Sequence, residues 1–345
     1  MLCTRRARLL WLDVVTGRGR AMVRPFVLVR LCRGNRELRG QSNVLRAATF
    51  VALSYMGRLI IIIERGRDIM RELAGRTAFV TGAASGIGLA LGRAFAEAGM
   101  NVMLADIEID ALATAVKSLD SFGRVRGVAC DVADPDSVEQ AAQAAYDAFE
   151  KVHVVCNNAG VGARGGIDNI SLDNWRWVFD VNVMGVLHGV RTFLPHIRSH
   201  GEGGHFVNTA SMAGIAAGQF FHPYGASKHA VVGMSEGLAM QLKPIGIGVS
   251  VLCPEFVRTQ IVASERNRPT RYGPKQEIEA GSPAAALYAQ LAARVESGID
   301  PSQVAAKVIA AIKDNDLYVF THPGMRLAIE KRLEAIVAAM DKLET

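Results

Sequence analysis

The feature that most constrains the fold is a glycine-rich junction between a short apolar run and a helical pattern. Residues 77–82 read T-A-F-V-T-G, and apolar side chains recur at helical spacing through residues 86–99, which end in glycine. The junction itself reads T-G-x-x-x-G-I-G at 81–88. Glycines there let the backbone turn tightly and approach a pyrophosphate, and the helix N-terminus supplies N–H donors. The pattern predicts a strand, a phosphate-binding loop and a helix.

Six further short apolar runs follow, with helical stretches between them. They lie at 101–106, 124–132, 152–160, 204–211, 247–254 and 317–323. Short apolar segments rich in β-forming residues, alternating with helices, are typical of a parallel sheet that helices cover on both faces. The pattern predicts an α/β fold, a doubly wound, Rossmann-type sheet of seven parallel strands in a single domain over residues 70–345. Residues 255–300 interrupt the alternation with prolines and polar residues, and we expect a substrate lid there.

The first 69 residues differ from the rest in charge. They hold 14 arginines, no lysine and four acids, which is +10, whereas the whole chain is +6 and the rest is therefore −4. The basic charge belongs to this irregular N-terminal extension, so we expect no nucleic-acid partner for the folded body. Three interpretations stay open: translation from a start upstream of a natural one at or near Met70, a targeting or anchoring segment, and an accessory segment.

Cysteine and histidine usage argues against several classes of site. The five cysteines are scattered without a C-x-x-C pair, which disfavours a disulfide framework or a zinc site and fits a reducing compartment. The eight histidines lack an H-E-x-x-H pattern, so we expect no metal site. No apolar run reaches 18 residues without a charge, which argues against a membrane span. We therefore expect a cytoplasmic protein.

Asp106 ends the second apolar run, 18 residues after Gly88. A carboxylate at this position can accept hydrogen bonds from the adenosine ribose hydroxyls, and it would repel a 2′-phosphate. The loop at 81–88 carries no arginine or lysine that could pair with such a phosphate. Together these observations predict NAD rather than NADP as the cofactor.

Tyr224 and Lys228 stand four residues apart in Y-G-A-S-K and would share one face of a helix. A nearby ammonium favours the phenolate and lowers the pKa of a tyrosine, which makes it usable as an acid and base near neutrality. Ser211 ends the run at 204–211, 13 residues before Tyr224. A hydroxyl at the carboxyl end of a strand can orient a substrate oxygen, so the three residues predict acid–base chemistry.

These motifs occur in a definite order along the chain. The order is the glycine loop at 81–88, N-N-A-G at 157–160, Asn182, Ser211 and Y-x-x-x-K at 224–228. In this order and spacing they resemble the short-chain dehydrogenase/reductase family, from about Leu73 to the C-terminus. The resemblance implies that the catalytic residues are Asn182, Ser211, Tyr224 and Lys228.

The resemblance also implies a role for each residue. Tyr224 would transfer the proton, and Ser211 would form a hydrogen bond with the reacting oxygen. Lys228 would bind the nicotinamide ribose and tune Tyr224, and Asn182 would hold a water that connects Lys228 to solvent. The implied cofactor contacts are Gly82, Ser85, Gly86, Ile87, Gly88, Asp106, Asp131, Val132, Asn158, Ala159, Gly160, Tyr224, Lys228, Pro254, Val257 and Thr259. Where the family usually has Pro-Gly this chain has Pro-Glu, at Glu255, so the path of that loop stays open.

The implied function is hydride transfer between NAD(H) and an alcohol or ketone. We expect an apolar substrate pocket, formed by Val161, Met212, Ala213, Gly214, Ile215, Phe220, Phe221, Phe256, Ile261, Val262, Tyr272, Leu287, Tyr288 and Leu291. Residues 268–273 and 314–323 resemble a branch that includes dehydrogenases of bulky secondary alcohols, lignin-derived aryl alcohols among them. We therefore expect a hydrophobic secondary alcohol, aryl, terpenoid or steroid-like, as substrate.

One alternative function stays open, a non-catalytic NAD-binding regulatory protein on the same fold. Such a protein would not need Ser211, Tyr224 and Lys228 together. The resemblance also implies a homodimer or homotetramer, formed through the helices that hold Asn182 and Tyr224.

Overall fold

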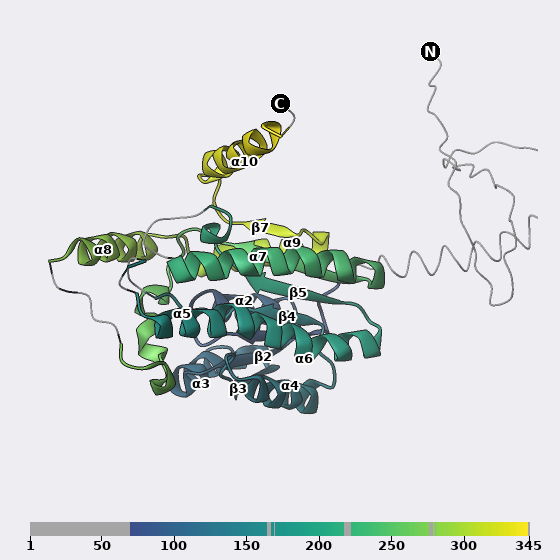
Figure 1. Ribbon diagram of the computed structural model, residues 1–345. Coiled ribbons are helices and arrows are strands. Elements are labelled where there is room, and N and C mark those ends of the chain that lie inside the picture. The colour runs from purple at the N-terminus through teal and green to yellow at the C-terminus, as the bar shows by residue number, and fades with distance from the viewer. Residues whose placement is uncertain are drawn as a thin grey trace, which may run out of the picture. The chain divides into compact units, whose positions relative to one another are not determined.

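A single sheet of seven parallel strands forms the centre of the computed structural model, which describes residues 70–163, 167–168, 170–216, 222–275, 279 and 281–343. The strand order is β3-β2-β1-β4-β5-β6-β7, and it confirms the predicted doubly wound fold (Figure 1). The strands are β1 (Thr77–Thr81), β2 (Asn101–Asp106), β3 (Val125–Ala129), β4 (Val154–Asn157), β5 (Gly204–Thr209), β6 (Ile247–Cys253) and β7 (Tyr318–Phe320). The predicted N-terminal extension lies outside the described residues.

Side chains alternate between the two faces of the central strands, and both faces are buried. In β1, Ala78 and Val80 join one hydrophobic core, whereas Phe79 joins the other. β2 repeats the alternation in register, with Met103 opposite Phe79 and Leu104 opposite Val80. Because neither face meets water, each central strand reads as a continuous apolar run rather than as an apolar–polar alternation.

Helices form a layer on each side of the sheet (Figure 1). One core is covered by α2 (Gly86–Glu97), α3 (Ile109–Lys117) and α9 (Pro301–Asp314). The other is covered by α4 (Pro135–Phe149), α6 (Gly185–His200) and α7 (His222–Leu242). Further α-helices of the described residues are α5 (Leu172–Phe179), α8 (Pro283–Glu296) and α10 (Arg326–Asp341), and η2 (Asp180–Met184) is a turn of π-helix between α5 and α6. Among the described residues, none of the helices combines the length and the apolar character needed to cross a bilayer.

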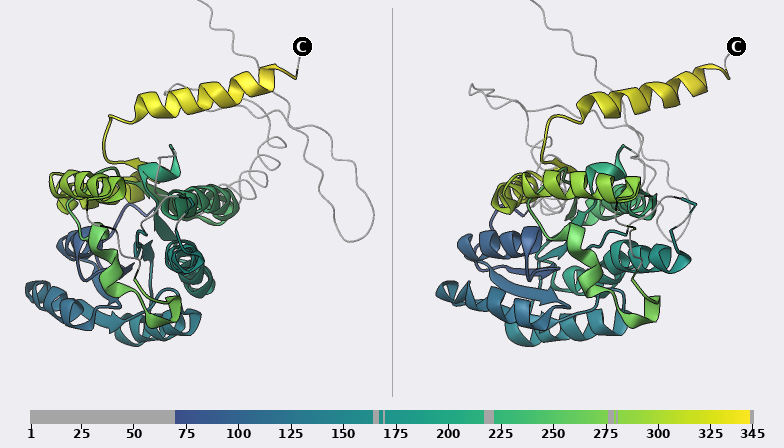
Figure 2. Two further views of the ribbon diagram at one scale, coloured as in Figure 1. Left: turned by 60° about the vertical axis from the view of Figure 1, so that its left-hand side comes forward. Right: turned by 90° about the vertical axis from the view of Figure 1, so that its left-hand side faces the viewer.

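The strand order reverses beside β1. The chain moves outward through β2 and β3 and then returns to β4 on the other side of β1. In open α/β sheets, ligands bind at the carboxyl ends of the strands where the order reverses. The predicted phosphate loop, between β1 and α2, lies at this point. The segment with η5 (Ile261–Asn267) and η6 (Thr270–Tyr272) crosses the same end of the sheet, in light green in Figure 2.

Two glycines make the sharp turn from β1 into α2 possible. Gly82 has a φ of +63°, in the left-handed region that favours glycine. A Cβ on Gly88 would lie only 2.1 Å from the carbonyl oxygen of Gly82. The first turn of α2 therefore packs directly against the loop that precedes it.

We expect Gly88→Ala to lower the midpoint of thermal unfolding and to abolish nucleotide binding, because the added methyl has no room beside the Gly82 carbonyl. Gly233, on the exposed side of α7, is the matched control, since a Cβ there meets nothing within 4 Å. Gly233→Ala should raise stability by up to about 1 kcal/mol through helix propensity. Thermal unfolding with and without NAD measures both effects. A Gly88→Ala protein as stable as the wild type, and equally stabilised by NAD, would contradict the packing argument.

Candidate active site

A cleft lies at the carboxyl ends of the strands and collects the predicted site residues. Its wall contains all of them except Gly88 and Asn182. Each of these two packs against a residue of the wall, Gly88 against Gly82 and Asn182 against Val161. Residues from widely separated parts of the sequence thus meet at one edge of the sheet.

Asn158 and Thr81 join the carboxyl ends of β1 and β4. The Thr81 hydroxyl accepts the N–H groups of Asn158 and Ala159 at 3.0 and 3.1 Å. In return, the Asn158 amide donates to the carbonyl oxygens of Thr81 and Gly82 at 3.0 and 3.3 Å. These bonds hold the glycine loop against the segment from Asn158 to Gly160, both of which line the cleft.

Asp106 lies at the end of β2, where the sequence analysis expects the adenosine ribose. The residue is 8% exposed, and its two carboxylate oxygens are each held by a backbone amide. Oδ2 accepts the Ala84 N–H at 2.8 Å, and Oδ1 accepts the Glu108 N–H at 3.0 Å. Because a carboxylate has about four acceptor positions, both oxygens keep the capacity to accept ribose hydroxyls.

Asn182 occupies η2, a turn of π-helix between α5 and α6. Its Oδ1 accepts the Val161 N–H at 2.8 Å, and its Nδ2 donates to the Val161 carbonyl and the Ser227 hydroxyl, both at 3.0 Å. A Cβ on Gly160 would lie 3.4 Å from Asn182 Oδ1 and 3.3 Å from Lys228 Nζ, so both side chains approach the same point. π-Turns are frequent at functional sites, and this one fixes the exit of β4 against α7. The water relay at Asn182 stays a prediction.

Ser211, Tyr224 and Lys228 come together from β5 and α7. Ser211 follows β5, and its hydroxyl accepts the Ala213 N–H at 3.1 Å. The same hydroxyl donates to the Pro254 carbonyl at 3.4 Å, and Tyr224 lines the cleft beside it, one turn of helix from Lys228. Lys228 is 3% exposed, and its ammonium donates to the Thr209 carbonyl at 2.7 Å and lies 5.7 Å from the centre of the Tyr224 ring. Serine and tyrosine hydroxyls therefore face the cleft side by side.

Burial controls how Tyr224 and Lys228 are protonated. Burial raises the pKa of Tyr224 above its usual range, and the hydrogen bond with Ser211 opposes this rise in part. Burial also lowers the pKa of Lys228 to about 8. The charge of the ammonium predicts a lowered pKa for Tyr224, whereas in the structure desolvation of the phenolate by burial is the largest cause and raises that pKa. Ser211 is the neighbour that draws this pKa down.

The loop after β6 contains Glu255 in place of the expected glycine. Even so, Glu255, Val257 and Thr259 all line the cleft. Val257 forms a parallel bridge with Ile299, which fixes the path of the loop. Thr259 lies against the glycine loop, since a Cβ on Gly86 would be 3.0 Å from its methyl carbon. The glutamate therefore does not move this loop away from the cleft.

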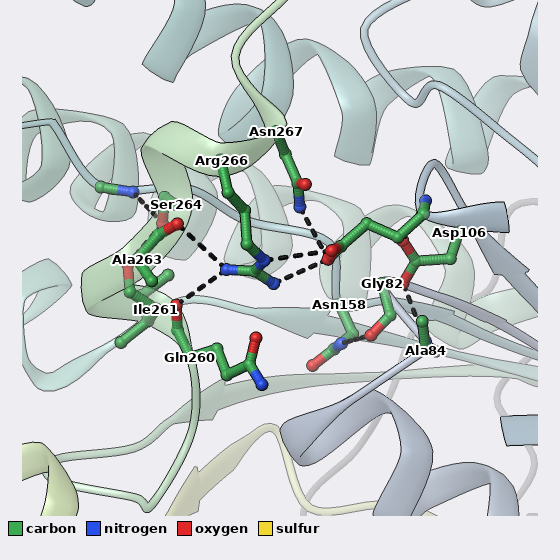
Figure 3. Close-up of polar contacts among 12 residues, drawn as sticks. Gly82, Ala84, Asp106, Asn158, Gln260, Ile261, Ala263, Ser264, Arg266 and Asn267 are labelled. Atoms are coloured by element: carbon green, nitrogen blue, oxygen red, sulfur yellow. Dashed lines mark hydrogen bonds and ion pairs between the residues drawn. The ribbon is translucent and has the colours of Figure 1, made fainter. Parts of the chain in front are cut away.

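The segment with η5 and η6, the expected lid, is bound to the far end of the cleft by ion pairs that have no sequence signature, and Figure 3 shows the contacts of Arg266. Arg266 of η5 binds both carboxylate oxygens of Glu108, at 3.1 and 2.7 Å, and Asn267 donates to the same carboxylate at 2.8 Å. Arg271 of η6 binds Asp131 at 2.7 Å. The partners are 158 and 140 residues apart in sequence, so local patterns cannot identify them. The segment thus spans the cleft from β6 to the ends of β2 and β3.

The predicted substrate pocket is only partly correct. Of its described members, Val161 and Ile261 line the cleft, and the structure adds Trp177, Val181 and Val295. The other described members do not line it, and Phe220 and Phe221 lie outside the described residues.

The course of the chain explains part of this difference. Immediately after Ser211 the backbone turns through η3 (Met212–Gly214), which directs Met212 into a hydrophobic core instead of the cleft. Tyr272 is 7% exposed and donates through its hydroxyl to Asp180 at 2.9 Å. Apolar residues near a motif can therefore belong to the packing of the fold.

A second polar cluster lies at the opposite edge of the sheet, before β4 and β5. His153, His200 and Glu202 are close enough to meet one ion. However, His153 Nδ1 accepts the Thr77 N–H at 3.2 Å, its Nε2 faces Glu202 at 3.0 Å, and Lys151 also pairs with Glu202. Burial is the largest cause of a lowered pKa for both histidines. These bonds explain the cluster as a connection between β1, β4 and β5.

Comparison with known proteins agrees with the fold and the order of motifs. The sequence model of short chain dehydrogenases matches residues 76–270. The chain is 31% identical to the C alpha-dehydrogenase of Sphingobium sp. (strain NBRC 103272 / SYK-6) over 278 residues, which are 80% of this chain and 90% of that protein. It is 34% identical to the 1-deoxy-11-beta-hydroxypentalenate dehydrogenase of Streptomyces exfoliatus over 268 residues, 77% of this chain and 90% of that protein.

A solved structure gives the same result. The crystal structure of a short chain dehydrogenase/reductase from Burkholderia phymatum in complex with NAD has a TM-score of 0.75 and 41% sequence identity. The similarity covers 78% of this chain and 97% of that one. The family model, the full-length relatives and the shared fold lead to one conclusion: the chain belongs to the short-chain dehydrogenase/reductase family of oxidoreductases.

Proposed function

We propose that this protein is an NAD-dependent dehydrogenase that oxidises a hydrophobic secondary alcohol to its ketone. The observation that carries the proposal is the position of Tyr224, which lines the cleft that contains the glycine loop, together with Ser211 and Lys228. A phenol beside a second hydroxyl can exchange a proton with a substrate oxygen that is hydrogen-bonded to both groups. A nucleotide-binding regulator would need neither side chain.

The residues of the cleft fit a dinucleotide. α2 begins without a side-chain cap and without an acid in its first turn, so its first N–H groups are available to a phosphate. Asp106 at the end of β2 supports NAD over NADP, since its charge opposes a 2′-phosphate. The Burkholderia phymatum relative in complex with NAD supports the same choice. Bound NAD would supply the redox chemistry by accepting a hydride.

The side chains account for the remaining part of the reaction. Oxidation of an alcohol removes one hydride from carbon and one proton from oxygen. Tyr224 as phenolate takes that proton, while Ser211 holds the oxygen in place. The Lys228 ammonium donates to the Thr209 carbonyl and lies 5.7 Å from the centre of the Tyr224 ring, so its charge is placed to stabilise the phenolate when it forms. The tyrosine then returns the proton to solvent.

Two observations support a hydrophobic substrate. Apolar residues from three separate parts of the chain line the cleft, namely Val161, Trp177 and Val295. The relatives include a hydroxypentalenate dehydrogenase and a C alpha-dehydrogenase, which supports an alcohol on a bulky carbon skeleton. An aryl, terpenoid or steroid-like secondary alcohol fits these features.

We expect Tyr224→Phe to reduce kcat by about 100- to 10,000-fold, the range for loss of a general acid–base group, with the Kd for NAD changed less than threefold. The matched control is Tyr146→Phe, because the Tyr146 hydroxyl is buried without a hydrogen-bond partner among the described residues. That variant should keep full activity. Steady-state kinetics and calorimetry give the two quantities. Comparable turnover in Tyr224→Phe would contradict the catalytic assignment, and inactivity of the wild type with tight NAD binding would favour the regulator.

Lys228 should make stability depend on pH. Its pKa is about 8 in the folded protein against an ordinary 10.5, so between these values the unfolded chain binds more protons. Stability therefore rises with pH across this window, and below pH 8 the full cost of the buried ammonium, about 3 kcal/mol, is present.

Urea unfolding of the wild type and of Lys228→Met tests this expectation. The unfolding free energy of the wild type minus that of the variant should rise by about 2–3 kcal/mol from pH 7 to pH 10. A matched substitution at the exposed Lys313 supplies the baseline. A constant difference between wild type and Lys228→Met over this range would show that the ammonium is not destabilised by burial.

Substrate class is tested with paired panels of secondary alcohols. We expect kcat/KM for cyclic, aryl and terpenoid alcohols to exceed that for sugars and hydroxy acids by at least about 100-fold, because a dry apolar wall gains nothing from extra hydroxyls. Reduction of NAD followed at constant pH gives the ratio. A preference for the polar panel would reject the substrate class and leave the roles of Tyr224 and Ser211 intact.

A further inference from the structure

Three carboxylates and two guanidinium groups meet at the adenosine end of the cleft. Asp106, Glu108 and Asp131 lie at or just after the ends of β2 and β3, whereas Arg266 and Arg271 come from the lid segment. The arginines are paired in a definite way, Arg266 with Glu108 and Arg271 with Asp131. The question is what these pairs do to a nucleotide that binds beside them.

Each nitrogen of the Arg266 guanidinium donates at least one hydrogen bond. Its Nε and Nη2 bind the two oxygens of Glu108 at 3.1 and 2.7 Å, and its Nη1 donates to the carbonyl oxygens of Gln260 and Ala263, both at 3.1 Å (Figure 3). Asn267 adds a third hydrogen bond to Glu108. Hydrogen bonding with Arg266 holds the pKa of the Glu108 carboxyl below its usual range, so the pair stays ionised.

This geometry is the one that an arginine uses to bind phosphate. Guanidinium groups bind carboxylates and phosphates with the same two-pronged arrangement. In dinucleotide-binding folds, an arginine near the adenosine ribose accommodates the 2′-phosphate of NADP. Arg266 lines the same cleft as Asp106, so this chain already contains a cation suited to NADP. Glu108 accepts hydrogen bonds from Nε and Nη2 of Arg266, the two donors that such a phosphate would need.

Asp106 alone does not account for all of this arrangement. Its Oδ2 holds the Ala84 amide, and its Oδ1 holds the amide of Glu108, which fixes where the Glu108 side chain begins. The Asp106 carboxylate therefore repels a 2′-phosphate. The Glu108 carboxylate pairs with Arg266, the cation that would otherwise attract that phosphate.

We infer that Glu108 is a second specificity residue for the cofactor, which excludes NADP by occupying Arg266. The inference rests on the proposed function, in which NAD is preferred, and it divides that preference between two carboxylates. It also gives the lid segment a part in cofactor choice, since Arg266 belongs to η5.

A double-mutant cycle on nucleotide binding tests the inference. Calorimetry gives Kd for NAD and NADP with the wild type, Glu108→Gln, Arg266→Ala and the double variant. AMP and adenosine 2′,5′-bisphosphate repeat the measurement at the adenosine end alone. We expect Glu108→Gln to improve NADP binding relative to NAD at least tenfold, because it frees Arg266. The double variant should lose most of this gain. Asp110→Asn, which removes an exposed acid two residues further on, should change the ratio less than twofold.

The cycle separates the possible failures. A gain that persists in the double variant would overturn the inference, since removal of negative charge would then be the whole effect. An unchanged ratio in Glu108→Gln would overturn it as well. A wild type that binds NADP as tightly as NAD would contradict the NAD preference of the proposed function, and the inference with it. That outcome is read from the wild-type measurement alone, so the two failures remain distinct.

Discussion

The hydrogen bonds between Thr81 and Asn158 hold together the two central strands at the point where the strand order reverses. One hydroxyl accepts two amides from the β4 exit, and one side-chain amide returns two bonds to the β1 exit. This junction positions the glycine loop and the segment from Asn158 to Gly160. It thereby also fixes where Gly160 lies against Lys228. The two residues are 77 positions apart, so the junction exists only in the assembled sheet.

The fold and most of the candidate site can be predicted from the sequence because their signals are local. Each central strand is apolar on both faces and reads as an unbroken run, and the glycine loop is a contiguous motif between strand and helix. Tyr224 and Lys228 are separated by one helical turn. These features need no knowledge of distant partners, and the parallel sheet then brings the carboxyl ends of the strands to one edge.

The rest depends on contacts across the sequence. Arg266 could not be matched with Glu108 from spacing, because the two residues are 158 positions apart. The protonation of Tyr224 is a further example. The sequence shows the charged neighbour, whereas burial, which dominates the pKa, is a property of the completed fold. Local motifs therefore predicted most of the site residues, whereas ion pairs between distant segments and the burial of each side chain required the structure.

The close packing of Gly88 on the Gly82 carbonyl has a consequence for binding. A loop whose backbone is wedged between β1 and α2 is preorganised, so it loses little conformational entropy when a pyrophosphate arrives. The lid segment is of the opposite kind, because exposed ion pairs hold it at the far end of the cleft and such pairs weaken as salt screens them. Backbone packing, which salt does not screen, thus fixes the glycine loop, whereas ion pairs that salt does screen hold the segment with η5 and η6.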